Sequence, residues 1–180
     1  LSPDEYGLIG ICLIFTTVLN GIVDSGFSNA LIRKKDVTDE DYNTMFTTNM
    51  AISIVLYVLL FISAPFVSDF FHRIELIALV RVTGLILFLN ALSITQVTIL
   101  TKNIDFKTKT KASLVSAIIS GVIGIAMAFM GYGVWSLVAQ QLSKQLLYTL
   151  CLWILNKWWP KFTFYKDSFK YMWGFGWKLL

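Results

Sequence analysis

Charged residues are scarce in this sequence. Asp, Glu, Lys and Arg make up 14% of its 180 residues, whereas soluble domains average about 25%. Hydrophobic residues make up 56%, and the mean hydropathy is +0.68. Helices on the surface of a soluble protein usually have a polar face. A soluble fold of this sequence would have to bury five long helices that have almost none. The composition therefore favours a membrane protein.

Residues that bind metals or cofactors are also scarce. Cys12 and Cys151 both lie inside apolar segments, so we interpret them as small core residues and not as a disulfide or metal pair. The single histidine, His72, lies in a short polar turn, where we expect it to be solvated. The sequence has no Gly-rich phosphate loop, no metal-ligand cluster and no nucleophile–base spacing. It therefore indicates no cofactor and no catalytic site.

Long apolar segments dominate the chain instead. Each has about the 20 residues that a helix needs to cross the hydrocarbon core of a bilayer: 6–32, 46–71, 76–100, 112–130 and 134–156. With their polar flanks we expect helices over about 3–32, 39–71, 76–101, 110–131 and 134–157, and a further helix from about 167. The predicted fold class is all-α, a polytopic membrane helix bundle. Leu1 is not a start residue and a new amphipathic pattern begins near Tyr171, so we expect a fragment of a longer protein.

The basic residues are distributed unevenly between the connections. Eleven of the 15 Lys and Arg residues lie in alternate connections: Arg33, Lys34, Lys35, Lys102, Lys107, Lys109, Lys111, Lys157, Lys161, Lys166 and Lys170. Cytoplasmic loops of membrane proteins carry such an excess. We therefore predict that 33–45, 101–111 and 157–170 are cytoplasmic. The same placement explains the pI of about 9.1 without nucleic acid as a partner, since these residues flank the bilayer and its anionic headgroups.

Local signals refine these helices. Thr38 and Asp41 have the spacing of a capping box at a helix start, and Pro65 predicts a kink near the far end of the same helix. Ser116, Ser120, Gly124 and Ala128 recur every four residues, which lets two membrane helices approach closely. Aromatic residues gather where an interfacial belt is expected: Trp153, Trp158, Trp159 and Tyr165.

Lys144 is the strongest candidate for a functional residue. It lies about 15 Å from either end of its predicted helix at 1.5 Å per residue, too deep to reach the interface easily. Three glutamines lie within a turn of it and give the helix a polar face, which Tyr148 extends: Gln140, Gln141 and Gln145. This face predicts the wall of a hydrated cavity that attracts an anion. The alternative is an interhelical hydrogen-bond seam in which Lys144 pairs with a carboxylate.

Two further ionisable residues lie inside apolar segments. Arg81 either extends to the outer interface, where Glu75 could pair with it, or points inward as a second cation of the chamber. Gln96 lies about 60° around the helix from Arg81, so both could share a face, whereas Asn90 lies opposite and suits a helix–helix hydrogen bond. Asp24 could couple a proton or sodium ion, or could be the counter-charge of a buried cation.

Several motifs together resemble a family of polysaccharide exporters. They are Leu1-Ser2-Pro3-Asp4-Glu5-Tyr6-Gly7, Gly26-Phe27-Ser28-Asn29-Ala30-Leu31-Ile32-Arg33-Lys34-Lys35-Asp36, Ala64-Pro65 before Phe70-Phe71, Arg81-Val82, and Gly131-Tyr132-Gly133-Val134-Trp135-Ser136-Leu137-Val138. Their order and spacing resemble the O-antigen and lipid-linked oligosaccharide flippases, closest to the colanic-acid-exporter-like branch. That family belongs to the multidrug/oligosaccharidyl-lipid/polysaccharide exporter superfamily.

The resemblance implies a protein of two helix bundles around a central cavity, of which this chain would be part of the N-terminal bundle. It implies that the substrate is an undecaprenyl-pyrophosphate-linked oligosaccharide, flipped across the bacterial cytoplasmic (inner) membrane. A polysaccharide polymerase and chain-length machinery would be its partners. It transfers no site residue to this chain. Two alternatives stay open: a cation-coupled multidrug exporter, which would carry more membrane carboxylates, and a membrane polysaccharide polymerase or ligase, which would carry a long outer loop with Arg and His.

Overall fold

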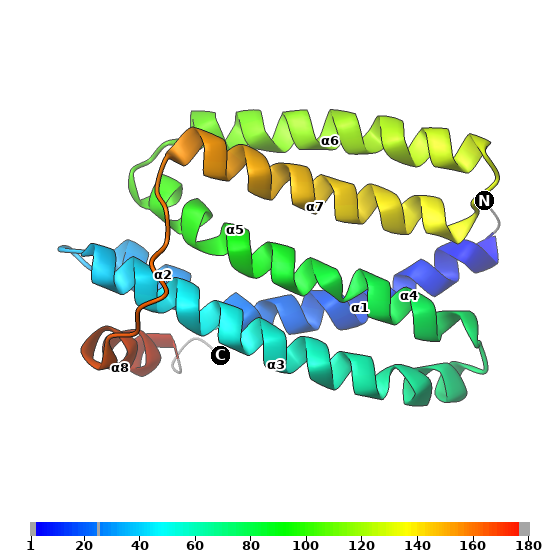
Figure 1. Ribbon diagram of the computed structural model, residues 1–180, viewed down its shortest axis with the longest axis horizontal. Helices are drawn as coiled ribbons and strands as arrows, with labels where there is room; N and C mark the ends of the chain where they lie inside the picture. The colour runs from blue at the N-terminus through cyan, green and yellow to red at the C-terminus, as the bar shows by residue number, and fades with distance from the viewer. Residues whose placement is uncertain (1–2, 25, 177–180) are drawn as a thin grey trace.

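The computed structural model describes residues 3–24 and 26–176, and every regular element in these ranges is a helix (Figure 1). In chain order they are α1 (Pro3–Asp24), α2 (Phe27–Arg33), α3 (Asp39–Phe71), α4 (Glu75–Thr83), α5 (Leu85–Lys102), α6 (Phe106–Phe129), α7 (Val134–Asn156) and α8 (Lys166–Gly176). The predicted all-α class is confirmed. The helix that was expected to begin near residue 167 is α8.

The long helices run back and forth along one direction, so their connections gather at two ends of the molecule (Figure 1). The α2–α3, α5–α6 and α7–α8 connections lie at one end, and the α3–α4 and α6–α7 turns lie at the other. The connections at 33–38, 103–105 and 157–165 therefore share one end of the bundle, and we call it the Lys-rich end because Lys residues lie in these connections or on the helix turns next to them. This arrangement places the three connections that were predicted to share one side of the membrane at the same end, and their assignment to the cytoplasm stays a prediction.

The first predicted helix is in fact two helices. The sequence favoured one helix over 3–32, but α1 ends at Asp24 and α2 begins at Phe27. Gly26 between them has a φ of 70°, in the left-handed region that a residue without a Cβ adopts easily. An apolar pattern that continues on both sides of one glycine does not reveal such a break.

The third predicted helix is also divided, at Gly84. The expected helix over 76–101 becomes α4 and α5, although the backbone of Gly84 itself stays in the right-handed helical region. A Cβ at this position would lie 2.9 Å from Leu60 Cδ2 and 3.1 Å from the Tyr57 ring of α3. A side chain at this position would therefore press against Leu60 and Tyr57, which α3 places next to the backbone of Gly84.

The fourth helix begins earlier than predicted. The helix was expected to begin at about residue 110, but α6 begins at Phe106 and includes residues 107–109 as well. The carboxylate of Asp105 caps this helix, since it accepts hydrogen bonds from the Thr108 amide at 3.1 Å and the Thr108 hydroxyl at 2.7 Å. The Lys residues of this segment therefore lie on the first turns of a helix.

Four helical stretches are long and apolar enough to cross a membrane: Glu5–Arg33, Asp39–Phe71, Glu75–Lys102 and Phe106–Phe129. The first three reach or pass the bounds of an expected apolar segment, and the fourth ends one residue before its segment does. The helix α3 continues through Pro65. The fifth expected span, α7, is one helix of 23 residues, but polar residues around Lys144 interrupt its apolar sequence. It lies alongside α6 over most of its length (Figure 1). The protein is thus a multi-pass membrane helix bundle.

The two helices α6 and α7 approach each other through small residues. Ser116 and Ser120 are 0% and 1% exposed, and Gly124 is buried one turn further on. A Cβ on Gly124 would lie 2.9 Å from the Gln140 Cβ of α7. The four-residue spacing of small side chains therefore marks the α6–α7 interface, as predicted.

Candidate functional site

A ladder of hydrogen bonds crosses three helices near the middle of the bundle. Asn90 of α5 donates to the Asn20 side chain of α1 over 2.9 Å. One turn along α5, the Ser93 hydroxyl donates to the Asn90 carbonyl and accepts from Gln145 of α7 at 3.2 Å. We call these four residues the polar seam. It matches the predicted helix–helix role of Asn90, and it joins α1 to α7 through α5.

Asp24 takes part in a second set of hydrogen bonds, at the break between α1 and α2. Ser28 of α2 donates to Asp24 Oδ1 over 2.5 Å, and the Thr98 hydroxyl of α5 donates to Ser28 at 3.0 Å. Among the described residues neither Lys144 nor Arg81 forms an ion pair with Asp24. The carboxylate therefore helps to hold α1 and α2 against α5, and it faces no counter-charge there.

Lys144 is exposed on α7. No carboxylate in the described part of the chain pairs with it. It lies roughly 160° around the helix from Leu142, which packs into the bundle core, and next to Tyr148 on one edge of α7. Tyr148 lines a surface hollow of about 340 Å³ with Lys109 and Ser113 of α6. An unpaired cation is thus presented midway along α7, one turn from the hollow that Tyr148 lines.

The three glutamines near Lys144 differ in what they contact. Gln145 belongs to the polar seam, and the half-buried Gln140 packs on Gly124 of α6. Gln141 is half-buried and makes no hydrogen bond to any described residue. The seam that the sequence allowed as an alternative is therefore present, but Gln145 forms it while Lys144 stays outside it.

Gln96 is fully buried and lies near the C-terminal end of α7. Its side-chain amide donates to the Trp158 carbonyl over 2.8 Å and its oxygen accepts from Asn156. The same end carries the predicted aromatic cluster, with the Trp153 and Trp159 rings 5.4 Å apart. The contacts of Gln96 thus fix the segment that follows α7.

Arg81 lies on another side of the bundle from Gln96. Its guanidinium carbon is 4.0 Å from the centre of the Phe61 ring of α3, and Tyr57 donates to the Arg81 carbonyl. Its Nε atom is buried and has no hydrogen-bond partner among the described residues. The structure therefore brings Arg81 to α3, and does not bring it together with Gln96 or Lys144.

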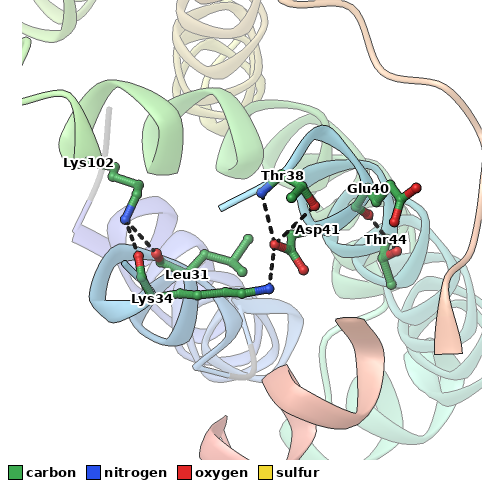
Figure 2. Close-up of polar contacts among 7 residues, drawn as sticks. All are labelled: Leu31, Lys34, Thr38, Glu40, Asp41, Thr44 and Lys102. Carbon is green, nitrogen blue, oxygen red and sulfur yellow. Dashed lines mark hydrogen bonds and ion pairs between the residues drawn. The ribbon is translucent and has the colours of Figure 1, made fainter. Parts of the chain in front are cut away.

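The sequence did not reveal a polar cluster at the Lys-rich end (Figure 2). The predicted capping box forms between Thr38 and Asp41, and the Asp41 carboxylate also binds the Lys34 ammonium at 2.6 Å. The Lys102 ammonium, from the last turn of α5, donates to the carbonyls of Leu31, at 3.2 Å, and of Lys34. These carbonyls end α2 and have no partner within the helix. The capping-box spacing was the only signal of this cluster in the sequence.

Comparison with known proteins decides the family. Residues 1–180 match the family described as "Polysaccharide biosynthesis protein" over the whole chain. The chain belongs to this polysaccharide biosynthesis family. The resemblance to polysaccharide exporters that the sequence motifs indicated is thereby confirmed.

Three similar proteins show how the chain relates to this family. It is 32% identical over 162 residues to the teichuronic acid biosynthesis protein TuaB of Bacillus subtilis. This match covers 86% of the chain and 32% of TuaB. It is 26% identical over 164 residues to the succinoglycan biosynthesis transport protein ExoT of Rhizobium meliloti. This match covers 91% of the chain and 33% of ExoT. A weaker match, 21% identical over 85 residues, covers 47% of the chain and 17% of the lipopolysaccharide biosynthesis protein WzxC of Escherichia coli.

The chain spans about a third of the length of the first two of these relatives. No solved structure matches it. The names of all three relatives refer to biosynthesis of a surface polymer, and the name of ExoT also refers to transport.

Proposed function

We propose that this chain forms part of a transporter that flips an undecaprenyl-pyrophosphate-linked oligosaccharide across the bacterial cytoplasmic membrane. The chain would be part of the N-terminal bundle of a two-bundle exporter, with 33–45, 101–111 and 157–170 on the cytoplasmic side. A polysaccharide polymerase and its chain-length machinery would use the flipped product. The names of TuaB and ExoT support the polysaccharide class, and the name of ExoT supports transport over catalysis.

The observation that carries the proposal is the position of Lys144. A pyrophosphate carries negative charge that cannot enter hydrocarbon without compensation. Lys144 presents an unpaired ammonium midway along α7, and ionisable residues at such depth usually face a protein interior or water. The neighbouring Gln141 is free of hydrogen bonds to described residues, so its amide is available to sugar hydroxyls. Gln140 and Gln145 would hold this face of α7 in place against α6 and α5.

The remaining candidates take more peripheral parts in this proposal. The hydrogen bond from Ser28 favours a structural role for Asp24 over ion coupling. Gln96 would position the segment after α7, and Arg81, stacked on Phe61, would stabilise the packing of α4 on α3. Lys144 is therefore the residue on which we expect substrate charge to depend.

The proposal is tested with the full-length protein in a strain from which its gene has been deleted. We expect the deletion to leave the lipid-linked oligosaccharide in the cytoplasmic leaflet, and the intact gene to restore the polysaccharide at the cell surface. Normal surface polysaccharide in the deletion strain would contradict the proposal. Extrusion of cationic dyes that depends on the gene would indicate a multidrug exporter instead.

A further inference from the structure

The segment that follows α7 is fastened to the start of α3. Three side chains on the first three turns of α3 make hydrogen bonds to backbone atoms of this segment. Asn43 accepts from the Lys161 amide at 2.7 Å, Thr44 accepts from the Tyr165 amide at 3.1 Å, and Thr47 donates to the Thr163 carbonyl at 3.2 Å. The connection therefore follows a defined path along α3 and delivers α8 to the end of α2 (Figure 1).

The packed face of α8 lies against α2. Met172 is 0% exposed and belongs to the same core cluster as Phe27, Ala30 and Leu31 of α2. The Phe27 ring lies 6.2 Å from the Phe169 ring, in an edge-to-face arrangement that is favourable for aromatic pairs. The contact between α8 and α2 is thus built from apolar and aromatic side chains.

Lys34 joins this apolar contact to the polar cluster at the cytoplasmic end. Its ammonium lies 2.6 Å from the Asp41 carboxylate and 5.1 Å from the centre of the Tyr171 ring of α8. Asp41 is only 1% exposed, so this charge depends on Lys34 for compensation. Lys34 therefore links α2, α3 and α8 at one point.

Lys34 is itself held in place by the end of α2. The Lys102 ammonium binds the carbonyls that end this helix, including that of Lys34. A cation at the C-terminus of a helix is favourable because of the partial negative charge there. The position of Lys34 is thus fixed from its backbone as well as from its side chain.

We infer that Lys34, Asp41 and Tyr171 form a latch that holds α8 on the cytoplasmic end of the bundle and that opens to let α8 move away. The functional meaning of this latch rests on the proposed transport function. A transporter that opens its site to each side in turn has to separate helices at the cytoplasmic end. The described structure has the latch closed. Its release involves the loss of the cation–π contact between Lys34 and Tyr171 and of the hydrogen bond between Ser168 and Asp41, whereas the Lys34–Asp41 ion pair holds α2 to α3.

The latch is tested by the accessibility of the face that α8 buries. Ser168 is 9% exposed on the packed face of α8, and its side chain is hydrogen-bonded to Asp41. Ser168→Cys keeps a donor of similar size at this position, and the protein with this change is the reference for every other variant. The full-length protein carries this change together with Cys151→Ser. Cys12, which lies on α1 and is 2% exposed, stays as a reporter of unfolding. The rate at which a water-soluble maleimide labels each thiol is followed by mass spectrometry, without substrate.

We expect Lys34→Ala and Tyr171→Leu to raise the labelling rate at position 168 by about tenfold, since about 1.4 kcal/mol changes an equilibrium constant tenfold. Lys35→Ala removes an exposed neighbouring cation, and Tyr171→Phe keeps an aromatic ring, so both should leave the rate unchanged. Equal rates in Lys34→Ala and Lys35→Ala would overturn the latch. A rise at Cys12 together with position 168 would also overturn it, because the whole bundle would then have opened.

The same measurement separates the latch from the proposed function. Lys144→Ala should abolish glycan transport and leave labelling at position 168 slow. If the latch variants label as expected while the intact protein moves no lipid-linked oligosaccharide, the latch stands and the proposed function fails.

Discussion

The Gln145 side chain donates a hydrogen bond to the Ser93 hydroxyl over 3.2 Å, and this contact joins α7 to α5 within the span of the bundle. The two residues are 52 positions apart in the sequence. Because the same hydroxyl donates to the Asn90 carbonyl, and Asn90 binds Asn20, the contact completes a path of polar groups from α7 to α1. The helix that bears Lys144 is therefore held at a fixed rotation about its axis.

Removal of this contact should cost a small but measurable part of the stability. We expect the double variant Gln145→Ala/Ser93→Ala to lose less stability than the sum of the losses in the two single variants. The difference, which is the coupling energy, should be about 0.6 kcal/mol, as for other hydrogen bonds between membrane helices. The measurement is a double-mutant cycle on unfolding in detergent micelles. Gln141→Ala is the matched control and should show no coupling to Ser93→Ala. Strict additivity of the first pair would contradict the contact.

A pair of glycines on α6 tests how closely α6 and α7 approach. Gly124→Ala places a Cβ 2.9 Å from Gln140 Cβ, and overpacking of this kind costs about 1–3 kcal/mol. Gly121→Ala meets nothing within 4 Å, so its stability should be unchanged or slightly raised. The midpoint of thermal unfolding in detergent distinguishes the two variants. Equal midpoints would show that the helices are further apart than described.

The Asp105 cap of α6 should give a pH-dependent contribution to stability. Hydrogen bonds from the Thr108 side chain and amide hold the pKa of Asp105 below its usual value. A carboxyl group whose pKa is lowered by folding stabilises the fold above its unfolded pKa of about 3.9, and this stabilisation is lost as the pH falls through the folded pKa. The melting temperature of Asp105→Ala should therefore lie below that of the parent protein at about pH 7, with the difference shrinking towards about pH 3. A difference that stays constant with pH would contradict the cap.

The sequence predicted the long helices because their apolar runs match the thickness of a bilayer, and it predicted the Lys-rich end because topology depends on loop cations. It did not predict the breaks at Gly26 and Gly84. A glycine within an apolar run is compatible with a continuous helix, and the close contacts at Gly84 come from Tyr57 and Leu60 of another helix. Local pattern carries no information about such crossings.

The candidate residues show the same limit. Their polarity at depth singled out Lys144, Gln145 and Asp24, but their partners lie on other helices and could not be derived from spacing. Arg81 illustrates this, since its helix position allowed an inward direction while the structure stacks it on Phe61. The Lys34–Asp41 pair was missed because loop cations at a membrane end are already explained by topology.

The role of Lys144 in transport can be measured as the rate at which the full-length protein, reconstituted in vesicles, moves a lipid-linked oligosaccharide from one leaflet to the other. We expect Lys144→Ala to abolish this movement and Lys144→Arg to retain most of it, because the substrate pyrophosphate requires a positive charge at this position. Lys107→Ala, which removes an exposed cation at the start of α6, should move the substrate at the rate of the parent protein. Equal rates for Lys144→Ala and the parent protein would contradict the central claim that Lys144 carries the substrate charge.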